Sequence, residues 1–318
     1  NGYQVIGLDN LNSYYDKTLK EKRLENISKE YSNGKNNWKF IENDLINKDA
    51  LISIFETYKP LIVINLAAQA GVRYSIDNPY AYVNSNVVGF LNILECCRTY
   101  PVNNLLYASS SSVYGGNTKI PFSELDAVNH PVSIYAATKR SNELMTHTYS
   151  HLFNIPSIGM RFFTVYGPWG RPDMAPMIFA DAILKNKPIK IFNYGNMSRS
   201  FTYINDIVEI VFKLINKPAK PDYDFDKKSP NPATSWTSHR IFNVGNDNPT
   251  TLIAFIRLIE NELGIESIKE YEDIQLGDVQ HTSSDCLSIK EWIGDTSQTP
   301  LKEGIKYFIK WYKDFYKY

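Results

Sequence analysis

A tyrosine and a lysine stand four residues apart in a segment of strong helical periodicity. Tyr135 and Lys139 would share one face of this helix, about one turn apart. An ammonium group beside a phenol favours the phenolate, so we expect Lys139 to lower the pKa of Tyr135 from its usual value of about 10. Such a phenol can take a proton from a sugar hydroxyl near neutral pH. The pair therefore predicts a general base.

Four consecutive serines, Ser109 to Ser112, leave a predicted buried strand shortly before Gly115. Hydroxyl groups in such a place are costly unless they are hydrogen-bonded, so the run favours a polar site over a plain turn. Ser110 precedes Tyr135 by 25 residues. We therefore expect a hydroxyl donor next to the phenol.

Carboxylates and small residues end other predicted strands. Asp9 ends the first strand, where an acidic residue of a dinucleotide-binding fold accepts hydrogen bonds from the adenosine ribose and disfavours NADP; a turn residue is the alternative. Asp44 and Leu45 follow another strand, where they could hold an adenine edge. The small residues between Leu66 and Gly71 would let a cofactor lie against the backbone or, equally, allow tight helix–strand packing.

Strands and helices must alternate to position these residues. Strands are predicted at Tyr3–Leu8, Trp38–Ile41, Leu61–Leu66, Asn104–Ala108 and Ser157–Phe163, and helices at Asp49–Tyr58, Pro79–Arg98 and Ser133–Phe153. This alternation indicates parallel βαβ crossovers and therefore an α/β fold with a doubly wound, Rossmann-type parallel sheet.

The rhythm loosens after about residue 164. Helices are predicted at Met174–Lys185, Asn205–Ile215, Thr250–Leu263 and from Leu301 onward, strands at Ile189–Phe192 and Ile241–Val244, and a loop at Lys217–Thr237. We therefore divide the chain into a domain of residues 1–165 and a smaller α/β lobe of residues 166–318, mainly for substrate, with segments that return to the sheet. Open α/β sheets bind ligands at the edge that such a lobe would cover.

The composition excludes several classes of protein. With 34 basic and 34 acidic residues the net charge is zero, which leaves no electrostatic footprint for nucleic acid or an anionic membrane. No apolar run approaches the roughly 18 residues that a membrane-spanning helix needs. The three cysteines have neither disulfide nor metal-ligand spacing, so we expect a reducing cytoplasm and no metal site.

Taken together, Asp9, the strand end at Ala67-Ala68, the serine run and the Tyr135/Lys139 pair resemble the extended short-chain dehydrogenase/reductase family over essentially the whole chain. Residues 68–75 (AQAGVRYS), 161–168 (RFFTVYGP) and 169–174 (WGRPDM) are similar more specifically to UDP-glucuronate 4-epimerases. The resemblance implies NAD-dependent epimerisation at C4 of a UDP-sugar, UDP-glucuronate to UDP-galacturonate, through a transient 4-keto sugar.

The resemblance implies roles for the matching residues. Tyr135 would take the proton of the C4 hydroxyl while hydride passes to the nicotinamide, and Lys139 would hold the nicotinamide ribose. Ser110 and Ser112 would hydrogen-bond the C4 oxygen. The implied cofactor residues are Asp9, Asn10, Asp44, Leu45, Leu66, Ala67, Ala68, Gln69, Asn86, Ser109, Tyr135, Lys139 and Phe162.

The substrate residues are expected in several loops. Arg171 is the choice for the sugar carboxylate, because a guanidinium fork matches a carboxylate bidentately; Arg73 is a weaker candidate. Arg199 matches a diphosphate-binding arginine, and Asp278 would contact the uridine-side ribose or fix an arginine. Ser111 and Thr164 complete the set. The alternatives are a surface arginine for Arg171, a helix-capping salt bridge for Arg199 and a plain turn residue for Asp278.

Other functions stay open. Dehydratases and UDP-glucuronate decarboxylases of this kind place acidic residues where this chain has Ser111 and Ser112, so both activities are less favoured. An epimerase for another UDP-sugar and a non-catalytic sugar-nucleotide binder remain as alternatives. The chain runs from Asn1 straight into a strand, without the family's first strand, glycine-rich loop and first helix. We therefore expect a fragment with an unpaired sheet edge, poor NAD binding and possible loss of activity.

Members of the family are commonly homodimers through two helices, here Pro79–Arg98 and Ser133–Phe153.

Overall fold

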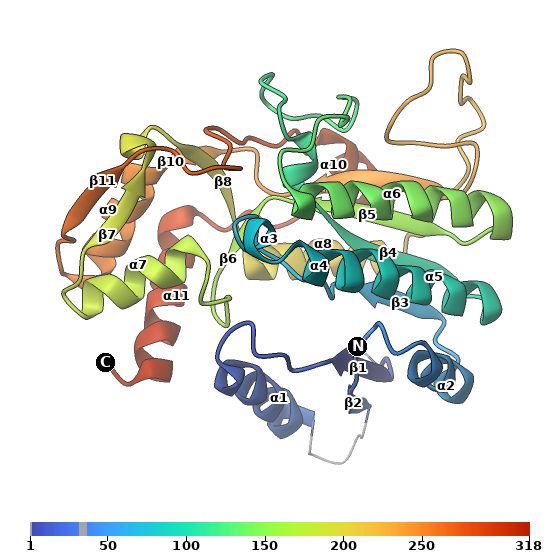
Figure 1. Cartoon of the computed structure of the whole chain (residues 1–318), viewed down its shortest axis with the longest axis horizontal. Helices are drawn as coiled ribbons and strands as arrows, with labels where there is room; N and C mark the ends of the chain where they lie inside the picture. Colours follow the sequence, from blue (N-terminus) through green and yellow to red (C-terminus); the bar gives the residue numbers. More distant parts are fainter. Residues whose placement is uncertain (1, 32–36) are drawn as a thin grey trace.

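The computed structural model describes residues 2–31 and 37–318. Its centre is a parallel sheet of four strands in the order β3-β4-β5-β9 (Figure 1). These strands are β3 (Ile62–Asn65), β4 (Asn104–Ser110), β5 (Ser157–Phe162) and β9 (His239–Val244). The predicted parallel α/β architecture is therefore observed.

The first two strands form a pair of their own. β1 (Val5–Asp9) runs parallel to β2 (Trp38–Glu42), and neither is hydrogen-bonded to β3. Within the described residues, one edge of β1 and one edge of β3 have no strand partner, as the sequence predicted. Leu66, just beyond β3, is 55% exposed. Asn1, on which the expectation about the start of the chain rests, lies outside the described residues.

Helices cover both faces of the four-stranded sheet. On one face, α2 (Lys48–Tyr58) and α5 (Phe90–Thr99) pack Phe55 and Phe90 against Leu105 of β4. On the other face, α8 (Ile204–Ile215) and α10 (Leu287–Ile293) pack against Ile158 of β5. Helices on both faces make the sheet doubly wound, and each face buries apolar side chains against them.

The single helix predicted over Pro79–Arg98 is instead three consecutive pieces. A π-helical segment, η1 (Val83–Gly89), separates α4 (Pro79–Tyr82) from α5. A π turn holds an extra residue, so the side chains beyond it are rotated about the helix axis. Across this stretch Phe90 and Leu94 are therefore buried, whereas Val83 and Leu91 are exposed.

The smaller lobe lies at one end of the sheet (Figure 1). It contains the sheets β10-β8-β6 and β11-β7, and helices that bury an aromatic core around Phe201, Phe255 and Phe308. Its elements are β6 (Thr164–Tyr166), α7 (Ala175–Leu184), β7 (Ile189–Phe192), β8 (Ser198–Tyr203), β10 (Pro249–Thr251), α9 (Leu252–Leu263), β11 (Lys269–Glu272) and α11 (Leu301–Tyr316). As expected, β9 returns from this half of the chain to the main sheet. The boundary at residues 165 and 166 stays a prediction.

Candidate active site

The predicted site residues gather where parallel strands end. Asp9 is the last residue of β1, Ser110 of β4 and Phe162 of β5, and Leu66 directly follows β3. The carboxyl ends of parallel strands meet at one edge of a sheet, where α/β proteins bind their ligands. This edge is therefore the candidate active site.

Tyr135 enters the site from the first turn of α6 (Ile134–Phe153). The helix begins here because the Ser133 hydroxyl accepts a hydrogen bond of 3.1 Å from the Ala136 N–H, as an N-cap does. The Tyr135 ring packs edge-to-face on Tyr82, with 6.1 Å between ring centroids. The Ser110 hydroxyl is near enough to this phenol to oppose the rise that burial causes in the pKa of Tyr135. This nearness agrees with the expected contact between Ser110 and Tyr135.

The expected effect of Lys139 on Tyr135 is wrong in this structure. Burial raises the pKa of Tyr135, and the groups that oppose this rise are Ser110 and, through its charge, Arg171. Lys139 is itself buried, which lowers its pKa to about 8. Its Nζ donates a hydrogen bond of 2.9 Å to the main-chain oxygen of Ala108. Burial makes it easier for this ammonium to lose its proton, although with a pKa of about 8 it remains mostly charged at neutral pH, and Lys139 is not among the groups that act on the pKa of Tyr135.

An ion pair with no solvent exposure supports the helix behind Tyr135. Glu143 of α6 accepts hydrogen bonds of 2.8 and 2.9 Å from Nε and Nη2 of Arg161 on β5. The Ser109 hydroxyl, at the end of β4, donates to the same carboxylate at 2.6 Å. Arg161 also donates to the Tyr114 hydroxyl at 3.1 Å. Three elements are thus joined beneath the site, and sequence analysis assigned no role to Glu143 or Arg161.

The side chains of two predicted cofactor-binding residues are hydrogen-bonded within the protein. The Asn86 amide, held by the π turn, accepts from the Gln69 N–H at 2.8 Å and donates to the Gln69 carbonyl at 3.0 Å. The Ser109 hydroxyl is taken by Glu143. Cofactor binding by Asn86 and Ser109 stays a prediction, and what their side chains do here is to fix the two strand ends.

Asp9, at the end of β1, is held by a main-chain donor and by a lysine. Asp9 accepts hydrogen bonds from the Leu11 N–H at 2.7 Å and from Nζ of Lys20 at 3.1 Å. Both use Oδ1, so in the described part of the chain Oδ2 keeps its capacity to accept. The nearby Lys20 ammonium weakens the repulsion of a phosphate that we expected from Asp9.

The remaining predicted cofactor residues differ in exposure. Asn10 donates to Asp44 at 2.7 Å, which ties the loops after β1 and β2 together. Leu45 is buried in the core, so its main chain alone could face a nucleotide. Ala67, Ala68 and Phe162 are partly exposed at their strand ends. Their contacts with a cofactor stay predictions.

The predicted substrate residues form two groups. Arg171 is near enough to Tyr135 for its charge to lower the pKa of that phenol. Arg73 instead forms an ion pair of 3.0 Å with Asp278 and stacks on Phe192, 4.7 Å from the ring centroid. The prediction that Asp278 would fix an arginine thus agrees with the structure, whereas a contact of Arg73 with the sugar carboxylate stays a prediction.

Arg199 belongs with the second group. Its Nη1 donates to the main-chain oxygens of Ser198 and Gln280, and burial lowers its pKa while the charge of Asp278 opposes that change. Ser111 and Ser112, in the short turn η2 (Ser111–Tyr114), are partly exposed, as is Thr164. Their substrate contacts stay predictions.

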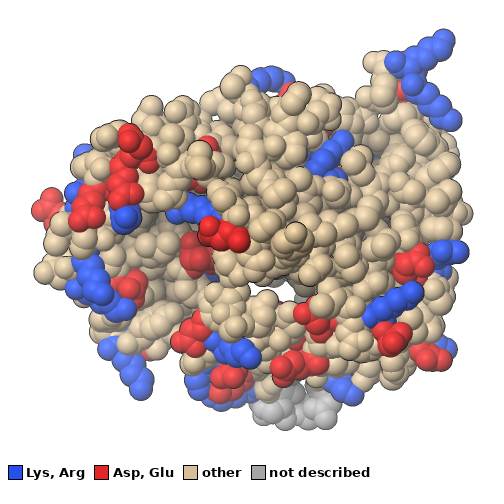
Figure 2. All heavy atoms as spheres, viewed as in Figure 1, with Lys and Arg blue, Asp and Glu red and all other residues tan. Residues whose placement is uncertain are grey.

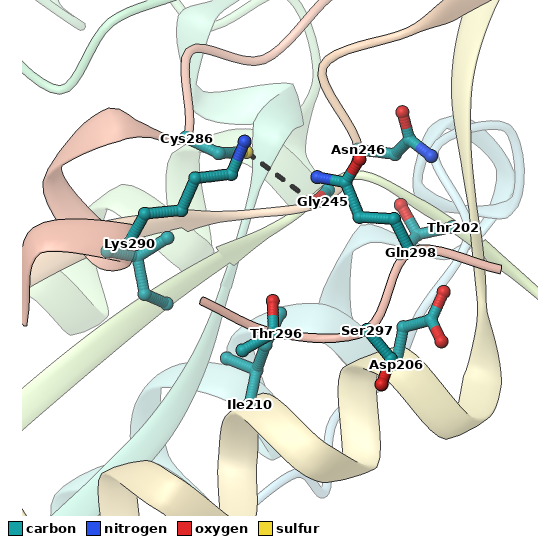
Figure 3. Close-up of a pocket in the computed structure, with 11 residues that line it drawn as sticks. Thr202, Asp206, Ile210, Gly245, Asn246, Cys286, Lys290, Thr296, Ser297 and Gln298 are labelled. Atoms are coloured by element: carbon teal, nitrogen blue, oxygen red, sulfur yellow. Dashed lines mark hydrogen bonds between the residues drawn. The ribbon is translucent and has the colours of Figure 1, made fainter. Parts of the chain in front are cut away.

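A small pocket is lined by other residues (Figure 3). It is lined by Thr202, Asp206, Ile210, Gly245, Asn246, Cys286, Ile289, Lys290, Thr296, Ser297 and Gln298. It has room for about one water molecule, which is far too little for a nucleotide sugar. Cys286 donates to the Gly245 carbonyl across it at 3.5 Å. None of the predicted site residues lines this pocket.

Charges of both signs are mixed on the surface. Figure 2 shows acidic and basic side chains interspersed over one face, and an opening between the N-terminal elements and the sheet above them. Among the described residues no His, Cys, Asp or Glu cluster could hold a metal ion, and no helix has the length and apolarity to cross a membrane.

A helix that carries Tyr135 and Lys139 beside the serine-bearing strand end of a Rossmann-type sheet is typical of a class of nucleotide-dependent enzymes. Residues 1–226 match the model of the NAD dependent epimerase/dehydratase family, and the chain belongs to that family. The predicted family and fold class are therefore confirmed.

Individual relatives resemble nearly the whole chain. Protein CapI of Staphylococcus aureus is 50% identical over 99% of this chain and 93% of its own length. A probable UDP-glucuronate 4-epimerase of Rhizobium meliloti is 41% identical over 99% of this chain and 92% of its own. The solved UDP-glucuronic acid 4-epimerase of Bacillus cereus, in complex with UDP-glucuronic acid and NAD, is 28% identical, with a TM-score of 0.85 and coverage of 99% and 92%.

Proposed function

We propose that the protein is an NAD-dependent UDP-sugar 4-epimerase that interconverts UDP-glucuronate and UDP-galacturonate. The observation that carries this proposal is the proximity of Tyr135, Ser110 and Arg171, in which the hydroxyl and the guanidinium charge both act on the phenol. A base for the C4 hydroxyl and a cation for the carboxylate on C5 of the same ring are thereby available together. Relatives named as UDP-glucuronate 4-epimerases support the choice of substrate.

The strand ends suit a dinucleotide. Lys139 is a buried ammonium whose one hydrogen bond within the described residues goes to Ala108, so two donors are available for ribose hydroxyls. Hydrogen bonds to such oxygens would also replace part of the hydration whose loss on burial lowers the pKa of Lys139 to about 8. At the other end, Oδ2 of Asp9 can accept from an adenosine ribose. When bound, NAD would take the hydride from C4 of the sugar and return it.

The side chains of the protein would handle the proton and the orientation. Tyr135 would take the proton of the C4 hydroxyl and later return it to the same oxygen, which Ser110 would hold by a hydrogen bond. Inversion requires that the sugar present its other face before hydride returns, so the ring must turn about its diphosphate link. Hydride and proton both come back, and the reaction is redox-neutral.

Dehydration or decarboxylation is the rival activity within the family. Either would need a free carboxylate beside Tyr135. Glu143 is bonded to Arg161, and Glu124 accepts from the Asn243 N–H at 2.8 Å, so these two buried carboxylates are already occupied. Ser111 and Ser112 cannot replace such a base. Epimerisation is therefore the favoured reaction.

The test is conversion of UDP-glucuronate by the purified protein with NAD, followed by chromatography of the sugars released on hydrolysis. We expect galacturonate to appear, and Tyr135→Phe to reduce its rate by at least about 100-fold, since general base catalysis contributes roughly 10²–10⁴-fold. Tyr223→Phe, at a tyrosine that is 91% exposed, is the matched control. A Tyr135→Phe enzyme with undiminished turnover would refute the proposal, and so would a xylose product, which indicates decarboxylation.

We also infer that a second copy of this chain packs on α4, η1, α5 and α6. Their outward faces expose Tyr80, Val88, Leu91, Leu144 and Leu152, and these helices lie side by side on the front of the molecule (Figure 1). Apolar side chains gathered on neighbouring helices favour a protein interface over open solvent.

A cytoplasmic location is supported by three buried cysteines, none of them in a disulfide.

A further inference from the structure

The guanidinium of Arg171 already has a carboxylate partner in its own loop. Nη2 of Arg171 lies 3.2 Å from Oδ2 of Asp173, and both side chains are 30% exposed. The same Nη2 also contacts Sδ of Met174 at 3.4 Å. Within the described part of the chain, Nη1 and Nε make no hydrogen bond. The pair is therefore a single contact and not a fork.

Asp173 is held from its other side by the loop that follows β1. The Tyr14 hydroxyl donates to Oδ2 of Asp173 at 3.3 Å. Burial, and next the charge of Asp173, raises the pKa of Tyr14 to about 12, so this phenol remains a donor at neutral pH. A Cβ added at Gly71 would lie 2.7 Å from the Tyr14 oxygen, so the loop after β3 packs directly over the contact. Asp173 thus keeps a donor when Arg171 turns away.

We propose that Asp173 determines specificity by occupying Arg171 until the carboxylate of a uronate sugar replaces it. The inference rests on the proposed function and extends it to a residue that does not carry out the chemistry. A partly exposed ion pair with one contact is weak, so a forked guanidinium–carboxylate pair can displace it. A neutral hydroxymethyl group offers no charge for this exchange, and with such a sugar the internal pair stays closed.

The opposite role for Asp173 would have the opposite sign. If Asp173 oriented Arg171 toward the substrate, its removal would weaken the binding of a uronate. If it competes with the substrate, its removal strengthens that binding. The sign of the change in Kd therefore separates the two roles.

Binding is best measured without turnover, in the Tyr135→Phe protein with NAD present. Calorimetric titrations would compare Tyr135→Phe with Tyr135→Phe/Asp173→Asn, for UDP-glucuronate and for UDP-glucose. We expect the Kd for UDP-glucuronate to fall about three- to fivefold, the size of a weak ion pair. The Kd for UDP-glucose should change by less than about twofold. Asp173→Ser removes the same charge and replaces Asp173→Asn if that variant does not fold.

Asp314→Asn is the matched control, because Asp314 pairs with Lys310 on the exposed face of α11, and it should change neither Kd. A weaker or unchanged Kd for UDP-glucuronate would overturn the proposal, as would equal changes for both sugars. Turnover by the wild-type enzyme separates the two failures. If galacturonate forms and the Kd ratio is unchanged, the inference fails while the proposed function stands; if none forms, both fail.

Discussion

The charged residues at the site differ in their exposure, and this difference decides how each can act. Lys139 is buried, which lowers its pKa, and Glu143 is buried but neutralised by Arg161. Arg171 keeps 30% of its side chain exposed, so it can exchange one partner for another. We therefore propose that Arg171 selects the substrate by charge, whereas Tyr135 transfers the proton.

Arg171→Ala should discriminate between substrates. Loss of a charged hydrogen-bonded contact, worth roughly 1.5–3 kcal/mol, should raise the KM for UDP-glucuronate about 10- to 100-fold and leave that for UDP-glucose within about threefold. Steady-state kinetics with both sugars measures this. Arg257→Ala, at an exposed position of α9, is the control. Equal losses on both sugars would mean that Arg171 only shapes its loop.

Single-residue chemistry was only partly predictable. The spacing of Ser110 and Tyr135 predicted that these two side chains lie close together, because helix and strand periodicity fix direction. The pKa values were not predictable, because they depend on how much water the folded chain excludes around each group. Asp173 and Tyr14 had a signal in the sequence: one lies two residues from Arg171, the other five residues after Asp9.

At the scale of secondary structure, a buried ion pair sets where α6 stands relative to the strands. Glu143 and Arg161 are both fully buried and bonded twice. Since Ser109 bonds the same carboxylate, the pair fixes the helix that carries Tyr135 against the strand that carries Ser110. Breaking the pair should therefore affect stability first.

Glu143→Ala should lower the free energy of unfolding by about 3–5 kcal/mol, because it leaves the Arg161 charge buried without a partner. The double variant Glu143→Leu/Arg161→Met should recover much of this loss, since it leaves no fully buried charge and only the partly exposed Arg140 without its partner. Urea denaturation followed by circular dichroism measures both. Arg140→Ala, which removes a partner at the edge of the network, should cost less. A loss below about 1 kcal/mol in Glu143→Ala would contradict this account.

Some elements escaped prediction for physical reasons. α1 (Lys17–Tyr31) carries charged side chains around most of its surface, and among its described side chains Leu19 and Lys20 are buried, so it has no apolar stripe to reveal it. The π turn depends on partners distant in sequence, because the Asn86 amide bonds Gln69 and Thr138. Neither cause is visible in local periodicity.

At the scale of the whole molecule, the exposed apolar face of α4–α6 should decide the oligomeric state. A double substitution, Leu91→Glu/Leu144→Glu, would place charges in the proposed interface, where they cannot be solvated. We expect light scattering on eluted protein to fall from twice 36.5 kDa to 36.5 kDa. Leu287→Glu, at a site 61% exposed on α10, should leave the dimer intact. A wild-type protein that elutes at 36.5 kDa would refute the interface.

The sequence by itself predicted the alternation of strands and helices, the closeness of Ser110 to Tyr135, and the family. The first two depend on periodicity and spacing, and the family on short motifs, all of which are local properties of the chain. Only the tertiary structure decided that burial would lower the pKa of Lys139, that Arg73 would pair with Asp278, and that Asp173 would occupy Arg171. Exclusion of water and contacts between distant segments arise only when the chain is folded, so no local pattern encodes them.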